Sequence, residues 1–152
     1  MFPKFIIGVM SAATLTFSTG AFAQAQLGTA AEAKAMLEKA VAAVKADKEK
    51  ALSMFNKGEG GFKDRDLYPF CFNLSDGKVV ATLAPTLGTD VRTLKDKAGN
   101  AFGEDVYKAA KEGQVTEVSY MFPRPGPDTT PVQKVSFVTK VGDLGCGVGY
   151  YK

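Results

Sequence analysis

The sequence of 152 residues contains no histidine and only two cysteines. Histidine is the commonest proton shuttle of enzymes and a frequent metal ligand, so its absence argues against a hydrolase or transferase and against a preformed metal site. No Cys-x-x-Cys-His segment is present for haem attachment. We therefore expect no metal, no cofactor and no enzymatic activity.

Paired carboxylates could still support acid–base chemistry, and two such pairs are present. They are Asp64 with Asp66, and Glu104 with Asp105. Neither pair has a recognisable acid–base spacing, so we interpret these residues as turn and helix-start residues. An enzyme that acts through lysine or carboxylates remains a weaker alternative to the two binding hypotheses given below.

The chain also lacks a block of charge of one sign. Its 19 basic and 16 acidic residues give a formal charge of +3 and are spread along the sequence. A protein that binds nucleic acid or an anionic membrane usually carries a concentrated basic patch. We therefore expect no nucleic-acid partner.

A long apolar run occurs at the amino terminus. Residues 1–23 combine a short basic start, an apolar stretch over 5–17 and the sequence Ala21-Phe22-Ala23, which is typical of a cleavage site. The alternative is a membrane anchor, but the stretch is shorter than the roughly 20 residues that cross a bilayer. We predict a cleavable signal peptide over 1–23, export to the periplasm, no membrane span after cleavage, and one domain over 24–152.

An amphipathic pattern over 29–55 predicts one long helix, because apolar residues recur there at three- and four-residue steps. Thr29 and Glu32 form a capping box at its start, and Asn56-Lys57-Gly58 is a stop signal. A coiled-coil dimer is the alternative. The alanine-rich stripe favours packing on the chain's own sheet.

Shorter elements are expected after this helix. We predict a turn over 91–94 and a helix over 101–111, with Asn100 as its cap and Gly113 at its end. Because the other connections are hairpin-length, we expect an antiparallel sheet and an α+β fold. The expected strands are 67–74, 79–84, 115–122, 132–141 and 144–151.

Each cysteine lies in the middle of an expected strand, Cys71 in the first and Cys146 in the last. Two cysteines in an exported protein usually form a disulfide, and the alternative is two buried reduced thiols. Because cross-linked Cα atoms lie about 5.5 Å apart, a disulfide makes these strands neighbours and gives the order 2-1-5-4-3. Glycines at alternate positions of the last strand would then give Phe70 and Phe72 room to lie flat.

This strand order with a long N-terminal helix is PAS-like, and the residues resemble the single Cache family of extracytoplasmic sensor domains. Five segments in the right order carry the resemblance over nearly all of residues 30–152. Two of them are the first hairpin, Leu67 to Ala81, and the aromatic–proline strand end, Tyr120 to Pro123. The other three match family patterns: Thr89 to Asp96 resembles GkdlrdLkD, Lys134 to Val138 resembles KlsyV, and Gly147 to Tyr151 resembles GsGiY.

Two departures from the family pattern affect what the resemblance implies. After the second strand the family often has His-Pro-Asn, whereas this chain reads Ala81-Thr82-Leu83-Ala84-Pro85-Thr86, so any ligand contact of that histidine is absent or replaced. Most such domains are tethered to a transmembrane helix and a signalling module. Because this sequence stops at Lys152 after a cleavable leader, we expect a free-standing soluble member.

The resemblance places a small-ligand pocket over strands 115–122 and 132–141, with the helical crossover as a lid. Alternate residues of these strands share a face and offer a small carboxylate aromatic walls, a cation and a hydroxyl. The alternative is that they are ordinary core or solvent-exposed residues. The candidate ligand-binding residues are Tyr120, Lys134, Phe122, Arg124, Ser136 and Tyr107.

The leading hypothesis is a non-catalytic periplasmic domain that binds a small organic ligand, a carboxylate or an amine, and presents it to a membrane sensor or transporter. The segment 90–113 would close over the sheet when the ligand binds. The alternative is a periplasmic protein-interaction or structural domain whose pocket is filled by its own side chains. The missing histidine favours that alternative.

Overall fold

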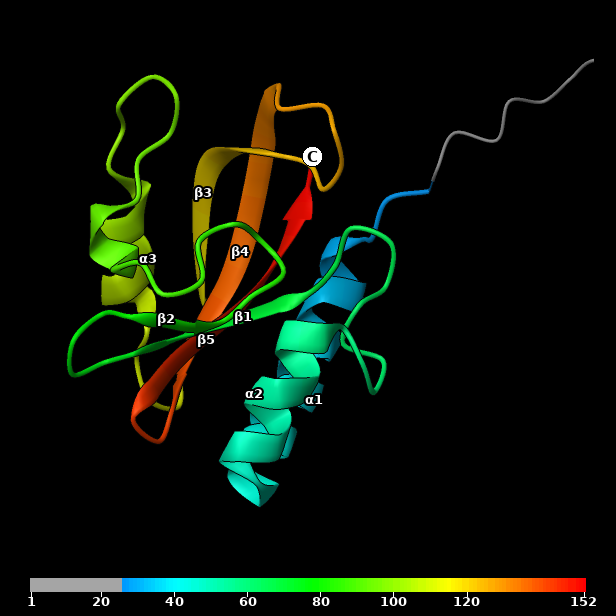
Figure 1. Cartoon of the computed structure of the whole chain (residues 1–152), viewed down its shortest axis with the longest axis vertical. Coiled ribbons are helices and arrows are strands. Elements are labelled where there is room, and N and C mark those ends of the chain that lie inside the picture. Colours follow the sequence, from blue (N-terminus) through cyan, green and yellow to red (C-terminus); the bar gives the residue numbers. More distant parts are fainter. Residues whose placement is uncertain (1–25) are drawn as a thin grey trace, which may run out of the picture.

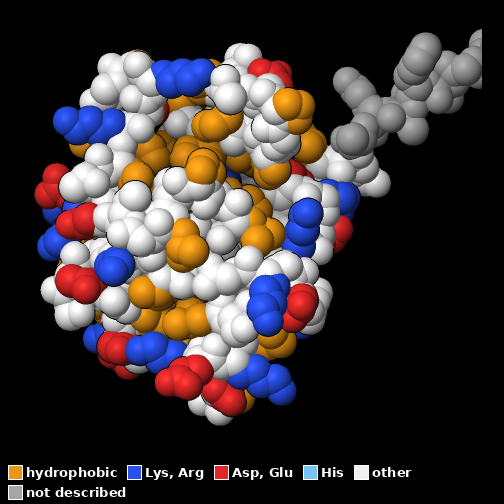
Figure 2. All heavy atoms as spheres, viewed as in Figure 1, with side chains coloured by type: hydrophobic (Ala, Val, Ile, Leu, Met, Phe, Trp, Pro, Cys, Tyr) orange, Lys and Arg blue, Asp and Glu red, His pale blue; other side chains and the backbone are white. Residues whose placement is uncertain are grey.

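The computed structural model describes residues 26–152, and Figure 1 shows a central sheet with helices on both of its faces. The signal peptide predicted over 1–23 lies outside the described residues. On the face seen in Figure 2, acidic and basic side chains are interspersed, and apolar side chains lie between them. Within 26–152, none of the helices has the length and hydrophobicity that crossing a membrane requires.

Five strands of the described chain form one antiparallel sheet in the order β2-β1-β5-β4-β3. This confirms the predicted α+β class and the predicted strand order. The carboxyl-terminal strand therefore lies in the centre of the sheet, beside the first strand. The strands are β1 (Pro69–Asn73), β2 (Val79–Ala81), β3 (Thr116–Pro123), β4 (Pro131–Val141) and β5 (Leu144–Tyr151).

The predicted disulfide is confirmed. Cys71 of β1 and Cys146 of β5 lie directly opposite each other, with their Cα atoms 4.1 Å apart. Both cysteines are fully buried, on the face of the sheet that the first two helices cover. The bond therefore ties the first strand to the last one inside the core.

Glycines of β5 make room for the aromatic rings of β1, as predicted. Phe70 lies opposite Gly147, and Phe72 lies opposite Gly145. A β-carbon on either glycine would overlap the ring that faces it. The pairing of β1 with β5 is thus fixed by close packing as well as by the disulfide.

The predicted single helix over 29–55 is in fact two helices, α1 (Ala30–Ala46) and α2 (Lys48–Lys57). Asp47 separates them with an extended backbone, φ −158° and ψ 99°. Its carboxylate accepts a hydrogen bond from the amide of Lys50 at 3.1 Å and so caps α2. A single helix would lose this cap. The capping box at the start of α1 is confirmed, and the left-handed Gly58 ends α2 as expected.

Both helices pack on one face of the sheet, as predicted, with α2 beside α1 (Figure 1). The small residues Ala33 and Ala40 of α1 are fully buried, which lets the helix backbone approach the strands closely. Leu37 and Phe55 fill the space between the helices and the sheet. This layer contains no candidate ligand-binding residue.

The crossover between β2 and β3 covers the other face. It contains the short 3₁₀ helix η1 (Val91–Thr93) and α3 (Phe102–Ala109), which buries Phe102 and Val106. Asn100 was expected to cap this helix but donates to the carboxylate of Asp96 at 2.8 Å instead. The residue before α3 is Ala101, which makes no side-chain cap.

Three predicted elements are longer than the observed ones. The strand predicted over 79–84 ends at Ala81, because the amide of Thr82 donates to the Asn56 side chain of α2 at 3.0 Å instead of continuing the ladder. The strand predicted over 67–74 is likewise shorter at both ends. α3 ends at Ala109 rather than at 111, so Gly113, whose φ is 67°, lies beyond its end.

Candidate functional site

A small pocket lies between the sheet and the crossover segment. Its walls come from the region just before β1, from β2 and the loop after it, from η1 and α3, and from the ends of β3 and β4. The pocket volume is about 40 Å³, which is room for roughly three water molecules. The lining residues are Tyr68, Phe70, Val79, Thr82, Ala84, Thr86, Val91, Leu94, Phe102, Val106, Tyr120, Phe122 and Lys134.

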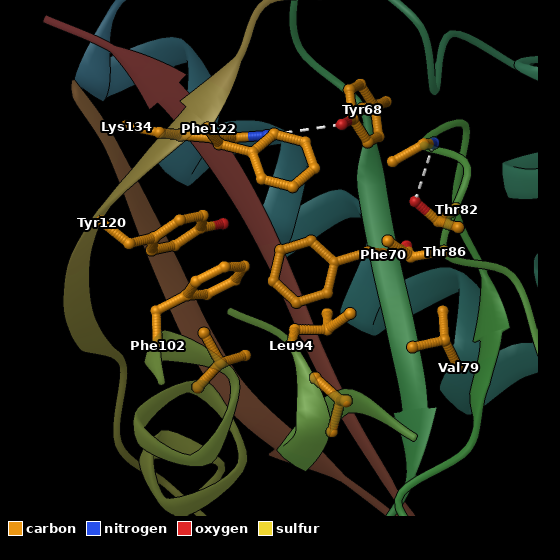
Figure 3. Close-up of a pocket in the computed structure, with 13 residues that line it drawn as sticks. Tyr68, Phe70, Val79, Thr82, Thr86, Leu94, Phe102, Tyr120, Phe122 and Lys134 are labelled. Atoms are coloured by element: carbon orange, nitrogen blue, oxygen red, sulfur yellow. Dashed lines mark hydrogen bonds between the residues drawn. The ribbon is translucent and has the colours of Figure 1, made fainter. Parts of the chain in front are cut away.

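The charged group of this pocket is the ammonium of Lys134 on β4, which is only 3% exposed. Its Nζ atom lies 3.4 Å from the hydroxyl oxygen of Tyr68, as Figure 3 shows. The same atom lies 4.7, 5.2 and 5.0 Å from the ring centroids of Tyr68, Phe122 and Tyr151. Three aromatic rings thus surround a buried cation.

Burial dominates the protonation equilibrium of this lysine. Removal of the ammonium from water lowers the pKa of Lys134 to about 8, and the negative charge of Asp66 offsets part of this shift. Among the described residues, no carboxylate lies within 4 Å of the ammonium. The three rings therefore do not compensate fully for the lost hydration.

Asp66 is the acidic residue that acts on Lys134 through space. It is 5% exposed, and one carboxylate oxygen accepts a hydrogen bond from the amide of Gly28 at 2.6 Å. Its other oxygen has no hydrogen-bond partner within the part of the chain that the structure describes. Asp66 lies in a turn beside Asp64, as predicted. It also anchors the segment before α1 from inside the structure.

Gly149 of β5 gives Lys134 its path to the aromatic rings. It lies opposite Ser136 in the β4–β5 pairing. A β-carbon at Gly149 would overlap the lysine stem and would lie 2.6 Å from the Ser136 hydroxyl. Because that side chain is missing, the lysine can cross β5 toward Tyr151 and Tyr68.

Tyr120 lines the pocket beside Lys134, which is its partner in the β3–β4 pairing. Its ring stacks on Phe102 of α3 with the centroids 4.3 Å apart (Figure 3). Its hydroxyl shares a 2.7 Å hydrogen bond with the hydroxyl of Ser136, in which either group can donate. Burial raises the pKa of Tyr120 to about 12, so the phenol stays neutral.

The structure brings together some of the residues predicted to bind a ligand. Lys134, Tyr120 and Phe122 line the pocket. Ser136 does not line the pocket, but its hydroxyl is hydrogen-bonded to that of Tyr120, which does. Arg124 and Tyr107 lie outside the pocket.

Tyr107 contacts the first hairpin instead. Its hydroxyl donates to the carbonyl of Leu74 at 2.5 Å, and its ring contacts Phe72 and Arg92. Tyr107 thus joins α3 to the first hairpin. Arg124 lines a second, larger hollow that adjoins the pocket.

Sequence reasoning missed Tyr68, Tyr151 and Gly149. Tyr68 precedes β1 and Tyr151 ends β5, so both lie far in sequence from Lys134. The β1–β5–β4 pairing brings them beside it. That pairing was itself predicted, so following the register across three strands would have indicated all three residues.

None of the four carboxylates considered for acid–base chemistry lines the pocket. Glu104 pairs with Lys108 and Asp64 pairs with Arg65, whereas Asp66 is buried and acts on Lys134 through space. Glu104 and Asp105 lie in the first turn of α3, as predicted. A buried cation with aromatic walls and phenol groups suits a small anion that carries an apolar part.

Comparison with solved structures identifies similar folds. The chain is similar to the periplasmic sensor domain of a chemotaxis protein, with a TM-score of 0.59 and 22% identity over 78% of this chain and 86% of that one. A methyl-accepting chemotaxis protein from Vibrio parahaemolyticus gives a TM-score of 0.60 and 21% identity, with coverages of 80% and 86%. A Cache chemosensory domain studied for carboxylic acid recognition gives 0.51 and 24%, with coverages of 78% and 84%.

These identities are low, so the structural similarities establish the fold alone. A search of curated proteins finds no match. The sequence itself matches the Cache domain family over residues 31–152, which include all five strands and the described helices except the first residue of α1. This confirms the family expected from the sequence segments. The chain belongs to the Cache domain family.

Proposed function

We propose that this protein is a periplasmic sensor-type domain that binds a small organic carboxylate at Lys134 and carries out no reaction. The observation that carries the proposal is the buried Lys134 ammonium, which forms no ion pair with any carboxylate of residues 26–152. A ligand carboxylate would supply the missing counter-charge in a site from which water is largely excluded, where an ion pair is stronger than at the surface.

The chemistry of the walls favours a carboxylate over an amine. An ammonium ligand would be repelled by Lys134, which already occupies the space between the three aromatic rings. A carboxylate would be attracted by the same group and could accept a hydrogen bond from the Tyr68 hydroxyl. A similar Cache domain has been studied for carboxylic acid recognition, which agrees with this choice.

Entry of a ligand requires movement of the crossover, because the pocket holds about 40 Å³. Residues 90–113 carry η1 and α3, and Phe102 presses on Tyr120 from α3. We propose that this segment opens to admit the carboxylate and closes over it. The closed form would then be presented to a membrane sensor or transporter.

Calorimetric titration with acetate and propionate at pH 7 tests the binding site. Lys134→Met keeps the aliphatic stem and removes the charge, so we expect it to abolish binding. Lys140→Met is the matched control, because Lys140 is on the same strand but pairs with Glu112 away from the pocket. Hydrogen exchange over 90–113 should slow when the acid binds to the wild type.

The alternative of an interaction or structural domain also has an observation in its favour. The protein's own lysine fills the space between the rings, and the remaining pocket is small. Under this alternative, neither acids nor amines raise the melting temperature, and exchange over 90–113 does not change. A melting temperature that no acid and no amine changes would therefore contradict carboxylate binding.

A further inference from the structure

A groove adjoins the pocket and shares three of its lining residues, Tyr68, Ala84 and Phe122. Its volume is about 450 Å³, roughly ten times that of the pocket. Tyr68 and Phe122 line both hollows, and the rings of both lie near the Lys134 ammonium, which therefore lies at the side of the pocket next to the groove. A ligand bound at Lys134 can therefore extend from the pocket into the groove.

Four basic side chains line the groove, among residues that are mostly apolar. Lys57 and Lys63 line it at one side, and Arg124 lines it from the proline-rich loop after β3. Among the described residues, none of these three makes an ion pair. A fourth cation, Arg65, is already paired with Glu32 and Asp64 at 2.8 Å each.

The groove contains one carboxylate, that of Asp128. It accepts a hydrogen bond from the amide of Thr130 at 2.9 Å, which holds it in the loop. Three unpaired cations against one carboxylate leave the groove with an excess of positive charge. It therefore favours an anionic group over a neutral or cationic one.

The Tyr151 ring sets an upper limit on the distance between the cation of the pocket, Lys134, and one cation of the groove, Arg124. Its centroid lies 5.0 Å from the Lys134 ammonium and 5.7 Å from the Arg124 guanidinium carbon, so these two cations are at most about 11 Å apart. A charge-assisted hydrogen bond of about 2.8 Å at each end leaves at most about 5 Å between two anionic groups. With carbon–carbon bonds of about 1.5 Å, a chain of up to roughly four or five carbons can span this distance.

We infer that the natural ligand is a short organic diacid, with one carboxylate at Lys134 and the other in the groove at Arg124 and its neighbouring lysines. This inference rests on the proposed carboxylate site and names the class of ligand for it. The pocket holds only the first carboxylate and the atoms next to it. The groove holds the rest of the molecule and selects for the second charge.

Titration of the full chain with glutarate and with pentanoate tests the inference, since both have five carbons and only one has a second carboxylate. We expect the wild type to bind glutarate at least tenfold more tightly. Arg124→Gln should weaken glutarate about tenfold and leave pentanoate within twofold. The double variant Lys57→Gln/Lys63→Gln should act in the same direction, and Lys34→Gln on the exposed side of α1 should change neither.

Several results would overturn the inference. Equal affinity of the wild type for both acids, or an equal loss for both in Arg124→Gln, would show that the groove does not read a second carboxylate. Binding of pentanoate alone would leave the carboxylate site intact and reject the diacid. If neither these acids nor acetate and propionate bind, the carboxylate site itself is rejected.

Discussion

At the scale of single residues, Lys134 determines the properties of the site. A lysine on a central part of a strand can point to solvent or inward, and alternation alone predicted only which residues share its face. Gly149 decides the direction, because its missing side chain opens the way across β5 to the rings of Tyr68 and Tyr151. The sequence shows this glycine, but its role depends on the β4–β5 register.

The buried charge of Lys134 predicts a pH-dependent stability. The native pKa is about 8 and the ordinary value is 10.5, so between these pH values the unfolded chain holds more of this proton. The free energy of unfolding of the wild type should therefore rise with pH relative to Lys134→Met. At pH 7 the native lysine is protonated, so the full free-energy cost of burying its charge is present. We expect Lys134→Met to be more stable than the wild type at this pH by about 1 to 3 kcal/mol.

Urea denaturation at pH 7 and pH 9.5 measures this difference, with Lys140→Met as the control. A difference between wild type and Lys134→Met that does not change with pH would contradict the buried cation. The affinity for a carboxylate should fall as the pH rises, whereas the relative stability of the wild type rises. Because the anion needs the protonated lysine, affinity should fall about tenfold for each pH unit above 8.

At the scale of elements, the sequence predicted the type and order of every strand and of the main helices. It predicted their ends less well, because ends depend on contacts between distant segments. β2 ends where Asn56 of α2 takes the amide of Thr82, and no local pattern indicates this hydrogen bond. The break at Asp47 is different, since an aspartate cap is visible in the sequence but the apolar periodicity continues through it.

The cap at Asp47 gives a prediction for the helical layer. Asp47→Ala removes the acceptor for the Lys50 amide, so we expect the free energy of unfolding to fall by about 1 kcal/mol. Asp47→Ser keeps a capping oxygen and should restore most of that loss. Urea denaturation of the three proteins checks this. Equal stability of Asp47→Ala and the wild type would show that the two helices can merge at no cost.

At the scale of the whole molecule, the pairing of β1 with β5 connects the fold to the site. Tyr68 leads into β1, whereas Gly149 and Tyr151 lie on β5. The aromatic rings of Tyr68 and Tyr151 therefore surround Lys134 only when β1 and β5 are paired. Recognising that the two cysteines meet was enough to predict this topology, whereas the expected place of the pocket came from the family resemblance.

The disulfide between Cys71 and Cys146 should contribute strongly to the stability of this arrangement. It joins residues 75 positions apart, and in the chain-entropy account closing such a loop stabilises the native state by about 4 kcal/mol. We expect the double variant Cys71→Ala/Cys146→Ala to lose about 2 to 4 kcal/mol in urea denaturation. Dithiothreitol should lower the wild-type midpoint in the same way and leave the double variant unchanged. An unaltered midpoint in both tests would mean that the glycine–aromatic packing of β5 on β1 is sufficient to hold the strands together.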